Sequence, residues 1–250
     1  MRKSAAPKFA KESDLCRAFI DDVERQYSGR WVPYAETGGF DLLLVRKADG
    51  LQLGIEAKLK LNPKVVSQAL RYWRYAETGP DYRAVLVPVT DLGDMGDICR
   101  ALGIGVMRQH HPAAGRWASY LSLPDPAYSH SEWMPWYPMN RITLPDYIPD
   151  VTAGSSAPMT LSSWKIAAIK AQILLEERPL SRADIKALGL SPSRWFDRYT
   201  GFLKPIDNGY VASSYMPDFA RQHPTNYEQI KADKGKWMAS LLKTLELASP

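Results

Sequence analysis

The chain has 250 residues, of which 45% are hydrophobic and 24% charged, so it can bury sizeable cores and is not a disordered chain. Its formal net charge is +5 and its pI is about 9.1, a modest basic surplus that suits a polyanionic partner without proving one. No apolar run approaches the roughly 20 residues of a membrane span, and the first residues lack the apolar core of a signal peptide. We therefore expect no membrane partner.

The two cysteines, Cys16 and Cys99, each fall in an apolar helical pattern and lack the spacing of metal ligands. We expect buried free thiols rather than a disulfide or a zinc site. Free thiols are typical of a reducing compartment, so the expected location is the cytoplasm.

Hydrophobic periodicity predicts an α/β domain over residues 1–111. The expected helices cover residues 12–27, 64–76 and 94–102, and the expected strands cover 31–35, 40–46, 51–59, 84–88 and 104–108. Asp49-Gly50 is a hairpin signal between the second and third strands. This order predicts a mixed sheet flanked by helices.

Residues 112–160 differ from the rest of the chain because they combine prolines with aromatic residues, among them Trp117, Trp133 and Trp136. Proline disfavours helix and sheet interiors, whereas so many aromatic side chains favour burial. We expect an extended arm that packs on a domain or on a protein partner, including a second copy of the chain.

Residues 161–250 predict a mainly helical domain. Helices are expected over 162–177, 182–188 and 191–199, followed by a strand, the turn Asp207-Asn208-Gly209, a second strand and a last helix over 227–245. Three short helices and a hairpin describe a winged helix-turn-helix.

The third expected strand alternates between two faces. Leu53, Ile55 and Ala57 share an apolar face, whereas Glu56 and Lys58 share the other. Asp41 lies on the preceding strand within a strongly apolar run, where a carboxylate is costly to bury without a partner or a metal. The hairpin brings Asp41 towards Glu56, and two carboxylates are suited to Mg²⁺ or Mn²⁺.

The pattern Asp41, then Glu56-Ala57-Lys58 on the next strand, resembles the PD-(D/E)XK, or restriction-endonuclease-like, nuclease superfamily over about residues 8–110. Phe40 stands where the superfamily's name implies proline. The resemblance implies a catalytic site of Asp41, Glu56 and Lys58, with Mg²⁺ or Mn²⁺ held by the two carboxylates.

The same resemblance implies two further site residues. Many members carry a metal-binding glutamate on the first helix, a position that Glu12 matches, and the alternative is that Glu12 only stabilises the helix N-terminus. Many also carry a glutamine on the helix after the lysine strand, which Gln68 matches; the alternative is an ordinary polar helix residue.

In a helix-turn-helix the second helix of the pair reads the major groove, which here would be residues 191–199. We expect Ser193, Arg194 and Arg198 on that helix, and Lys204 on the wing, to contact DNA. Winged helices also serve as protein-docking modules, so a protein partner remains an alternative.

A nuclease-like domain followed by a winged helix is similar in order to the endonuclease subunit of heteromeric transposons, a mobile-element enzyme that has glutamine where this chain has Glu56. The first hypothesis is a metal-dependent DNA endonuclease. The second is a catalytically silent nuclease fold that binds DNA or protein, such as a regulator or a phage-encoded inhibitor.

Overall fold

The structure is a computed structural model that describes residues 8–71, 77–89, 92–114, 121–125, 133–155 and 159–247. The chain divides into two compact units. The first is Met1–Leu144 with Val151–Thr160, and the second is Pro145–Asp150 with Leu161–Pro250. Most of the expected arm over 112–160 thus belongs to the first unit, and six of its residues belong to the second.

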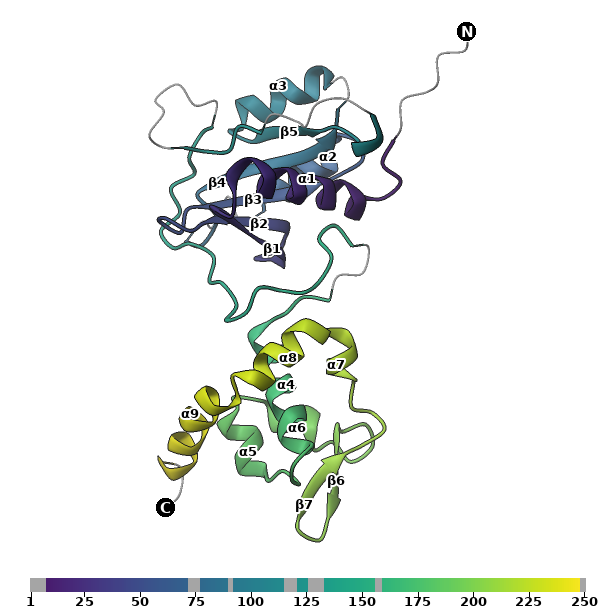
Figure 1. Cartoon of the computed structure of the whole chain (residues 1–250), viewed down its shortest axis with the longest axis vertical. Helices are drawn as coiled ribbons and strands as arrows, with labels where there is room; N and C mark the ends of the chain where they lie inside the picture. The colour runs from purple at the N-terminus through teal and green to yellow at the C-terminus, as the bar shows by residue number, and fades with distance from the viewer. Residues whose placement is uncertain are drawn as a thin grey trace. The chain divides into compact units, whose positions relative to one another are not determined.

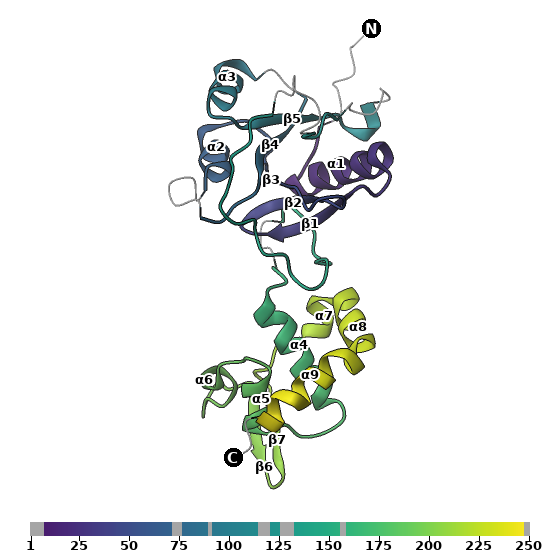
Figure 2. The same cartoon turned by 90° about the vertical axis from the view of Figure 1, so that its left-hand side faces the viewer.

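The first unit is built on a mixed sheet in the order β1-β2-β3-β4-β5. The described strands are β1 (Trp31–Thr37), β2 (Phe40–Arg46), β3 (Gln52–Ala57), β4 (Tyr82–Pro88) and β5 (Gly105–Gln109). The pairs β1–β2 and β2–β3 are antiparallel, whereas β3–β4 and β4–β5 are parallel. Helix α1 (Glu12–Tyr27) covers one face, and α2 (Pro63–Ala69) and α3 (Gly93–Ala101) cover the other (Figures 1 and 2). The expected mixed sheet flanked by helices is confirmed.

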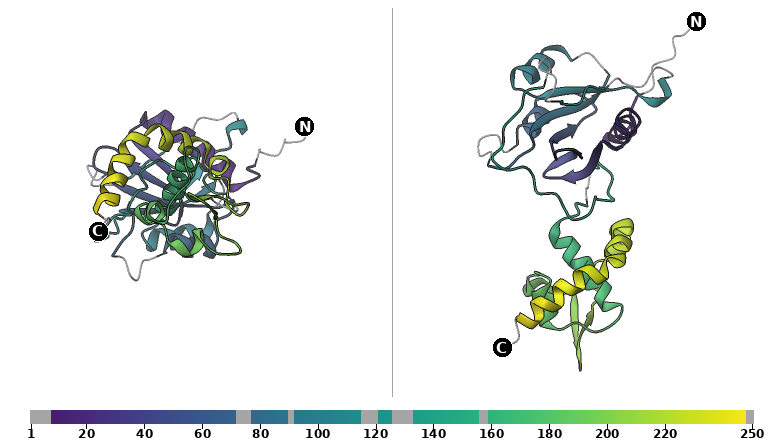
Figure 3. Two further views of the ribbon diagram at one scale, coloured as in Figure 1. Left: turned by 90° about the horizontal axis from the view of Figure 1, so that it is seen from below. Right: turned by 60° about the vertical axis from the view of Figure 1, so that its left-hand side comes forward.

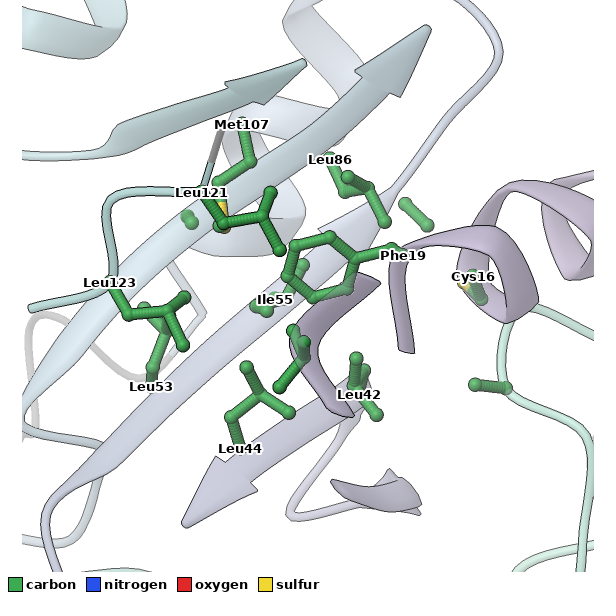
Figure 4. Packing of buried hydrophobic residues seen from close by; sticks show 14 of the residues in the cluster. Cys16, Phe19, Leu42, Leu44, Leu53, Ile55, Leu86, Met107, Leu121 and Leu123 are labelled. Atoms are coloured by element: carbon green, nitrogen blue, oxygen red, sulfur yellow. The ribbon is translucent and has the colours of Figure 1, made fainter. Parts of the chain in front are cut away.

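Two apolar cores separate the sheet from its helices. Under α1, Phe19 packs on the sheet face that carries Leu42, Leu44 and Ile55 (Figure 4). Under α2 and α3, a smaller core contains Val65, Val66, Ala69, Val85, Cys99 and Ile104. Because side chains alternate along β3, Ile55 faces α1 and Glu56 faces α2. Both cysteines are buried free thiols, as expected.

The described residues within 112–144 and 151–155 belong to the first unit and have little regular structure of their own. They begin with a 3₁₀ turn, η2 (Pro112–Ala114). Leu121 and Leu123 join the core under α1. The Gln52 side chain donates to the carbonyl of Ile142 and accepts from its N–H, at 2.8 and 2.9 Å. These contacts satisfy polar groups at the start of β3, the central strand, that would otherwise be buried without partners. Trp117 lies outside the described residues.

The second unit contains six helices and a hairpin in the part of the chain that is described. They are α4 (Ser163–Leu175), α5 (Arg182–Ala187), α6 (Pro192–Trp195), β6 (Leu203–Ile206), β7 (Gly209–Ala212), α7 (Phe219–Gln222), α8 (Pro224–Ala232) and α9 (Lys234–Leu247). The hairpin β6–β7 projects from the helices of this unit (Figure 3). Leu180, between α4 and α5, forms an antiparallel bridge with Tyr210 on β7.

The prediction of a helix over 191–199 is wrong, because α6 has one turn only. The Asp197 carboxylate accepts hydrogen bonds from the N–H groups of Tyr199 and Thr200 at 2.9 and 2.7 Å. These N–H groups are therefore not available for the backbone hydrogen bonds of a longer helix. The short α7 was not predicted.

The last helix was also predicted wrongly, as one segment over 227–245. It is two helices, α8 and α9, with a break at Asp233. The indole of Trp237 donates to the carbonyl of Ile230 at 2.8 Å and occupies the acceptor that a continuous helix would use.

Two elements are shorter than the sequence predicted: β3 ends at Ala57, and α2 ends at Ala69. Residues 72–76 of the expected helix lie outside the described residues. None of the helices in the described ranges is both long and apolar enough to cross a membrane.

Candidate active site

Three acidic residues occupy neighbouring positions in the register of adjacent strands. Leu42 pairs with Ile55, so extending this register by one residue sets Asp41 opposite Glu56. On the other side of β2, Ala35 pairs with Leu42 and Thr37 with Phe40, so Glu36 occupies the position opposite Asp41. The two-residue turn Gly38-Gly39, with φ of 62° and 80°, fixes this register. Glu36, Asp41 and Glu56 are therefore neighbours in the register of β1, β2 and β3.

Asp41 is partly buried at the start of β2. Its Oδ2 accepts the N–H of Ala57 at 2.8 Å, which holds the carboxylate against the end of β3. Burial raises the pKa of Asp41, and the Ala57 N–H and the positive charges of Lys58 and Arg71 oppose that rise. A cation bound next to Asp41 would favour the ionised form of this carboxylate.

Glu56 is 2% exposed, and its Oε1 is buried with no hydrogen-bond partner among the described residues. Burial, together with the negative charge of Asp41, raises the pKa of Glu56 to about 8. A buried carboxylate oxygen without a partner is costly, and it is a common feature of functional sites.

Lys58 follows directly after β3, and its N–H donates to the Leu86 carbonyl. Its ammonium lies 2.6 Å from Glu12 Oε2, an ion pair between two partly exposed side chains. Burial lowers the pKa of Lys58, but the hydrogen bond and charge of Glu12 outweigh it, so the pKa is raised. Glu12 is therefore connected to the site through its ion pair with Lys58.

Gln68 lies on α2, which packs against β3 and β4. Asn62 caps the start of this helix, where its side chain accepts the N–H of Val65 at 3.1 Å, and Pro63 occupies the first turn. Gln68 Oε1 is buried and lacks a hydrogen-bond partner within the described ranges. Thus Gln68 and Glu56 each carry an unsatisfied buried oxygen, on two elements that pack together.

Sequence reasoning missed Glu36, whose carboxylate is buried in this cluster. Its Oε1 accepts the N–H groups of Gly154 and Ser155 at 2.9 and 3.4 Å. Burial, together with the charge of Asp41, raises the pKa of Glu36 to about 7. Its φ of 49° is uncommon for a residue with a side chain. The hairpin register was the signal that could have identified it.

The buried thiol of Cys16, on α1, lies close enough to these acidic residues to interact with their charges. Burial raises its pKa, and Asp41, Glu36 and Glu12 add to the shift through their negative charge. Burial and these charges therefore disfavour the thiolate form of Cys16.

The four residues expected to contact DNA are all exposed in the second unit. Ser193 and Arg194 lie on α6, and Lys204 lies on β6. Arg198 lies beyond the end of α6 and not on it. The guanidinium of Arg194 stacks 4.7 Å from the ring of Phe202, which ties α6 to the base of the hairpin.

Asp41, Glu56 and Gln68 carry oxygen atoms, the donor type that a hard divalent cation takes. Among the residues that the structure describes, no group of three or more His, Cys, Asp or Glu side chains is arranged to hold a metal ion. Mg²⁺ is commonly bound through one or two carboxylates, with waters and substrate phosphate completing its shell. The paired Asp41 and Glu56, the latter with an unsatisfied oxygen, meet that requirement, and the Gln68 amide oxygen is a third candidate donor.

No protein-family model matches the chain, and searches of curated proteins and of solved structures find no match.

Proposed function

We propose that this protein is a metal-dependent deoxyribonuclease of the restriction-endonuclease-like type, which hydrolyses phosphodiester bonds at Asp41, Glu56 and Lys58. The observation that carries the proposal is the register that sets Asp41 opposite Glu56, together with a buried Glu56 oxygen that has no hydrogen-bond partner in the described chain. The antiparallel β1-β2-β3 meander, followed by the parallel β4, also agrees with the resemblance drawn from the sequence.

In this proposal, Asp41 and Glu56 hold Mg²⁺ or Mn²⁺, and Gln68 supplies an amide oxygen to the ion or orients a water. When bound, the ion polarises the scissile phosphate and makes its water more acidic. Hydrolysis joins the water oxygen to phosphorus and breaks one ester P–O bond, whose oxygen leaves with a proton. Lys58, held by Glu12, orients the attacking water and stabilises negative charge on the phosphate oxygens.

The second unit supports a role in delivering DNA. Its α4, α5 and α6 with the β6–β7 hairpin, and the bridge from Leu180 to Tyr210, agree with a winged helix-turn-helix. Since α6 has one turn, we infer that Arg194 and Lys204 contact phosphates and that reading of base edges is limited. A protein partner docked on this unit is the alternative.

The test is cleavage of supercoiled plasmid and linear DNA with Mg²⁺ or Mn²⁺. Wild-type protein should cut, whereas Lys58→Ala and Glu56→Ala should each lose about 100-fold or more in rate. Melting temperatures of the variants show whether they are folded. Equal cutting by wild type and both folded variants would overturn the proposal.

A further inference from the structure

Arg71 lies beside the carboxylate cluster, and the motif at Asp41, Glu56 and Lys58 does not include it. It follows α2 and stands three residues, about one helical turn, after Gln68. Its Nη1 donates to the carbonyl of Gly39, two residues before Asp41. The end of α2 and the start of β2 are therefore joined at the cluster through this guanidinium.

The absence of a side chain at Gly39 leaves room for the guanidinium of Arg71. A methyl group on Gly39 would lie 2.6 Å from Arg71 Nη1, too close for a real contact, and the φ of 80° at Gly39 disfavours any side chain. Gly39 thus serves both the tight turn and the close approach of the guanidinium to the backbone.

A second arginine holds Arg71 in place. The carbonyl of Arg71 accepts a hydrogen bond from Nη1 of Arg83, which also donates to the Ala69 carbonyl at 2.8 Å. Arg83 is 1% exposed and stacks 4.5 Å from the ring of Trp136. The backbone of Arg71 is therefore fixed from inside the domain, while its side chain is only partly buried.

The positive charge of Arg71 acts on both carboxylates. It lowers the pKa of Glu56 and that of Asp41 against the effect of burial. Lys58 acts on the same two groups, but its ammonium is already paired with Glu12. In the described chain, the guanidinium of Arg71 donates only to the Gly39 carbonyl, which leaves most of its five N–H groups for a ligand.

We propose that Arg71 binds the phosphate at which the chain is cut, by donating two guanidinium N–H groups to its non-bridging oxygens. This inference rests on the proposed nuclease function. A planar guanidinium matches phosphate oxygens in a forked, two-bond geometry that an ammonium cannot reproduce. The positive charges of Arg71 and Lys58, which both act on Asp41 and Glu56, would draw the phosphate to the carboxylate pair despite the repulsion of its negative charge.

The test uses the full chain and compares Arg71→Ala and Arg71→Lys with Arg100→Ala. Arg100 is an exposed arginine of the same unit, with a side chain that is 82% exposed and paired only with Asp97 among the described residues. Two quantities are measured. One is the single-turnover cleavage rate of a short duplex with Mg²⁺, and the other is the salt dependence of binding to a fluorescein-labelled duplex with Ca²⁺ in place of Mg²⁺.

We expect Arg71→Ala to slow cleavage by about 100-fold and to lower the slope of log affinity against log salt by about 1. Arg71→Lys should keep the salt slope and still cut at least about tenfold more slowly than wild type, because the fork is lost. Arg100→Ala should match wild type in both measurements. Because Arg71→Lys retains the charge and a donor, it keeps the test valid should Arg71→Ala unfold.

The two proposals fail in different ways. If wild type cuts DNA and the Arg71 variants cut as fast as Arg100→Ala with an unchanged salt slope, the role of Arg71 is overturned and the nuclease stands. If wild type never cuts but Arg71→Ala alone lowers the salt slope, the nuclease proposal is overturned and phosphate binding by Arg71 stands.

Discussion

The ammonium of Lys58 lies 2.6 Å from a carboxylate oxygen of Glu12, so an ion pair joins the residue after β3 to the first residue of α1. Both side chains are partly exposed, and such a pair contributes little to the stability of the fold. Its consequence is local: it fixes the position of the one lysine that the proposed chemistry uses. A catalytic group held before substrate arrives loses less entropy in the reaction.

Replacing Glu12 by glutamine should therefore impair function more than folding. We expect Glu12→Gln to slow Mg²⁺-dependent cleavage by about tenfold or more, because Lys58 loses its charged partner. The free energy of unfolding should fall by less than about 1 kcal/mol. Single-turnover cleavage and urea unfolding measure the two effects. Asp21→Asn, an exposed acid of the same helix, should change neither, and an equal loss of rate in that control would contradict a specific role for Glu12.

The raised pKa of Glu56, about 8, makes the metal-free protein sensitive to pH. The folded chain keeps a proton that the unfolded chain releases above the ordinary glutamate pKa of 4.5. The stabilising contribution is therefore complete below about pH 4.5 and is lost as pH rises to about 8. Glu36, with a pKa of about 7, acts in the same direction.

In the Glu56→Gln variant, the loss of folding stability with rising pH should be smaller. With a chelator at about pH 8, we expect the variant to be more stable than wild type by roughly 4 kcal/mol, and near pH 5 the difference should largely vanish. Urea unfolding at several pH values measures this. Glu24→Gln, at an exposed position of α1, is the control and should follow wild type. A pH profile of Glu56→Gln identical to that of wild type would show that Glu56 is already ionised.

Arg83 should be important for stability. Burial lowers its pKa to about 10, and it donates to carbonyls at the end of α2, which would otherwise be left buried without donors. Arg83→Met should lower the free energy of unfolding by about 3 kcal/mol. Arg100→Met, at a mostly exposed side chain, should cost less than about 0.5 kcal/mol. Urea unfolding that shows equal costs would contradict the capping role.

The second unit should bind DNA through phosphates. Replacing Arg194 and Lys204 together by alanine should weaken binding to unrelated duplexes by similar factors and lower the salt slope by about 2. Fluorescence anisotropy across a salt series measures both. Lys243→Ala, at an exposed position of α9, is the matched control. A loss confined to one DNA sequence would point instead to reading of base edges.

The strands that carry the candidate site could be predicted from the sequence because each has a local signal. Asp49-Gly50 marks one turn, and the alternation around Ile55 and Glu56 identifies the two faces of β3. The other site residues depend on contacts between distant segments. The hairpin register indicates that Glu36 lies next to Asp41, but its carboxylate accepts hydrogen bonds from the N–H groups of Gly154 and Ser155, more than a hundred residues away. No periodicity in a local window reports such a contact.

The helical errors also have physical causes. At α6, one side chain, Asp197, takes the N–H groups that a longer helix needs. At Asp233, the amphipathic pattern continues through the break, because α8 and α9 both contribute to one core, through Ile230 and Trp237. Apolar periodicity predicts which residues are buried more reliably than where each helix ends.

The central claim is that Asp41 and Glu56 together hold a divalent cation, and calorimetric titration of the metal-free protein with Mn²⁺ at about pH 8 tests it most directly. We predict saturable binding to the wild type, weakened at least about tenfold in Asp41→Asn and in Glu56→Ala, and unchanged in Glu24→Gln. Absence of Mn²⁺ binding to a folded wild-type protein that still binds DNA, or equal binding by all four proteins, would contradict the claim and favour a nuclease-like fold that binds without cutting.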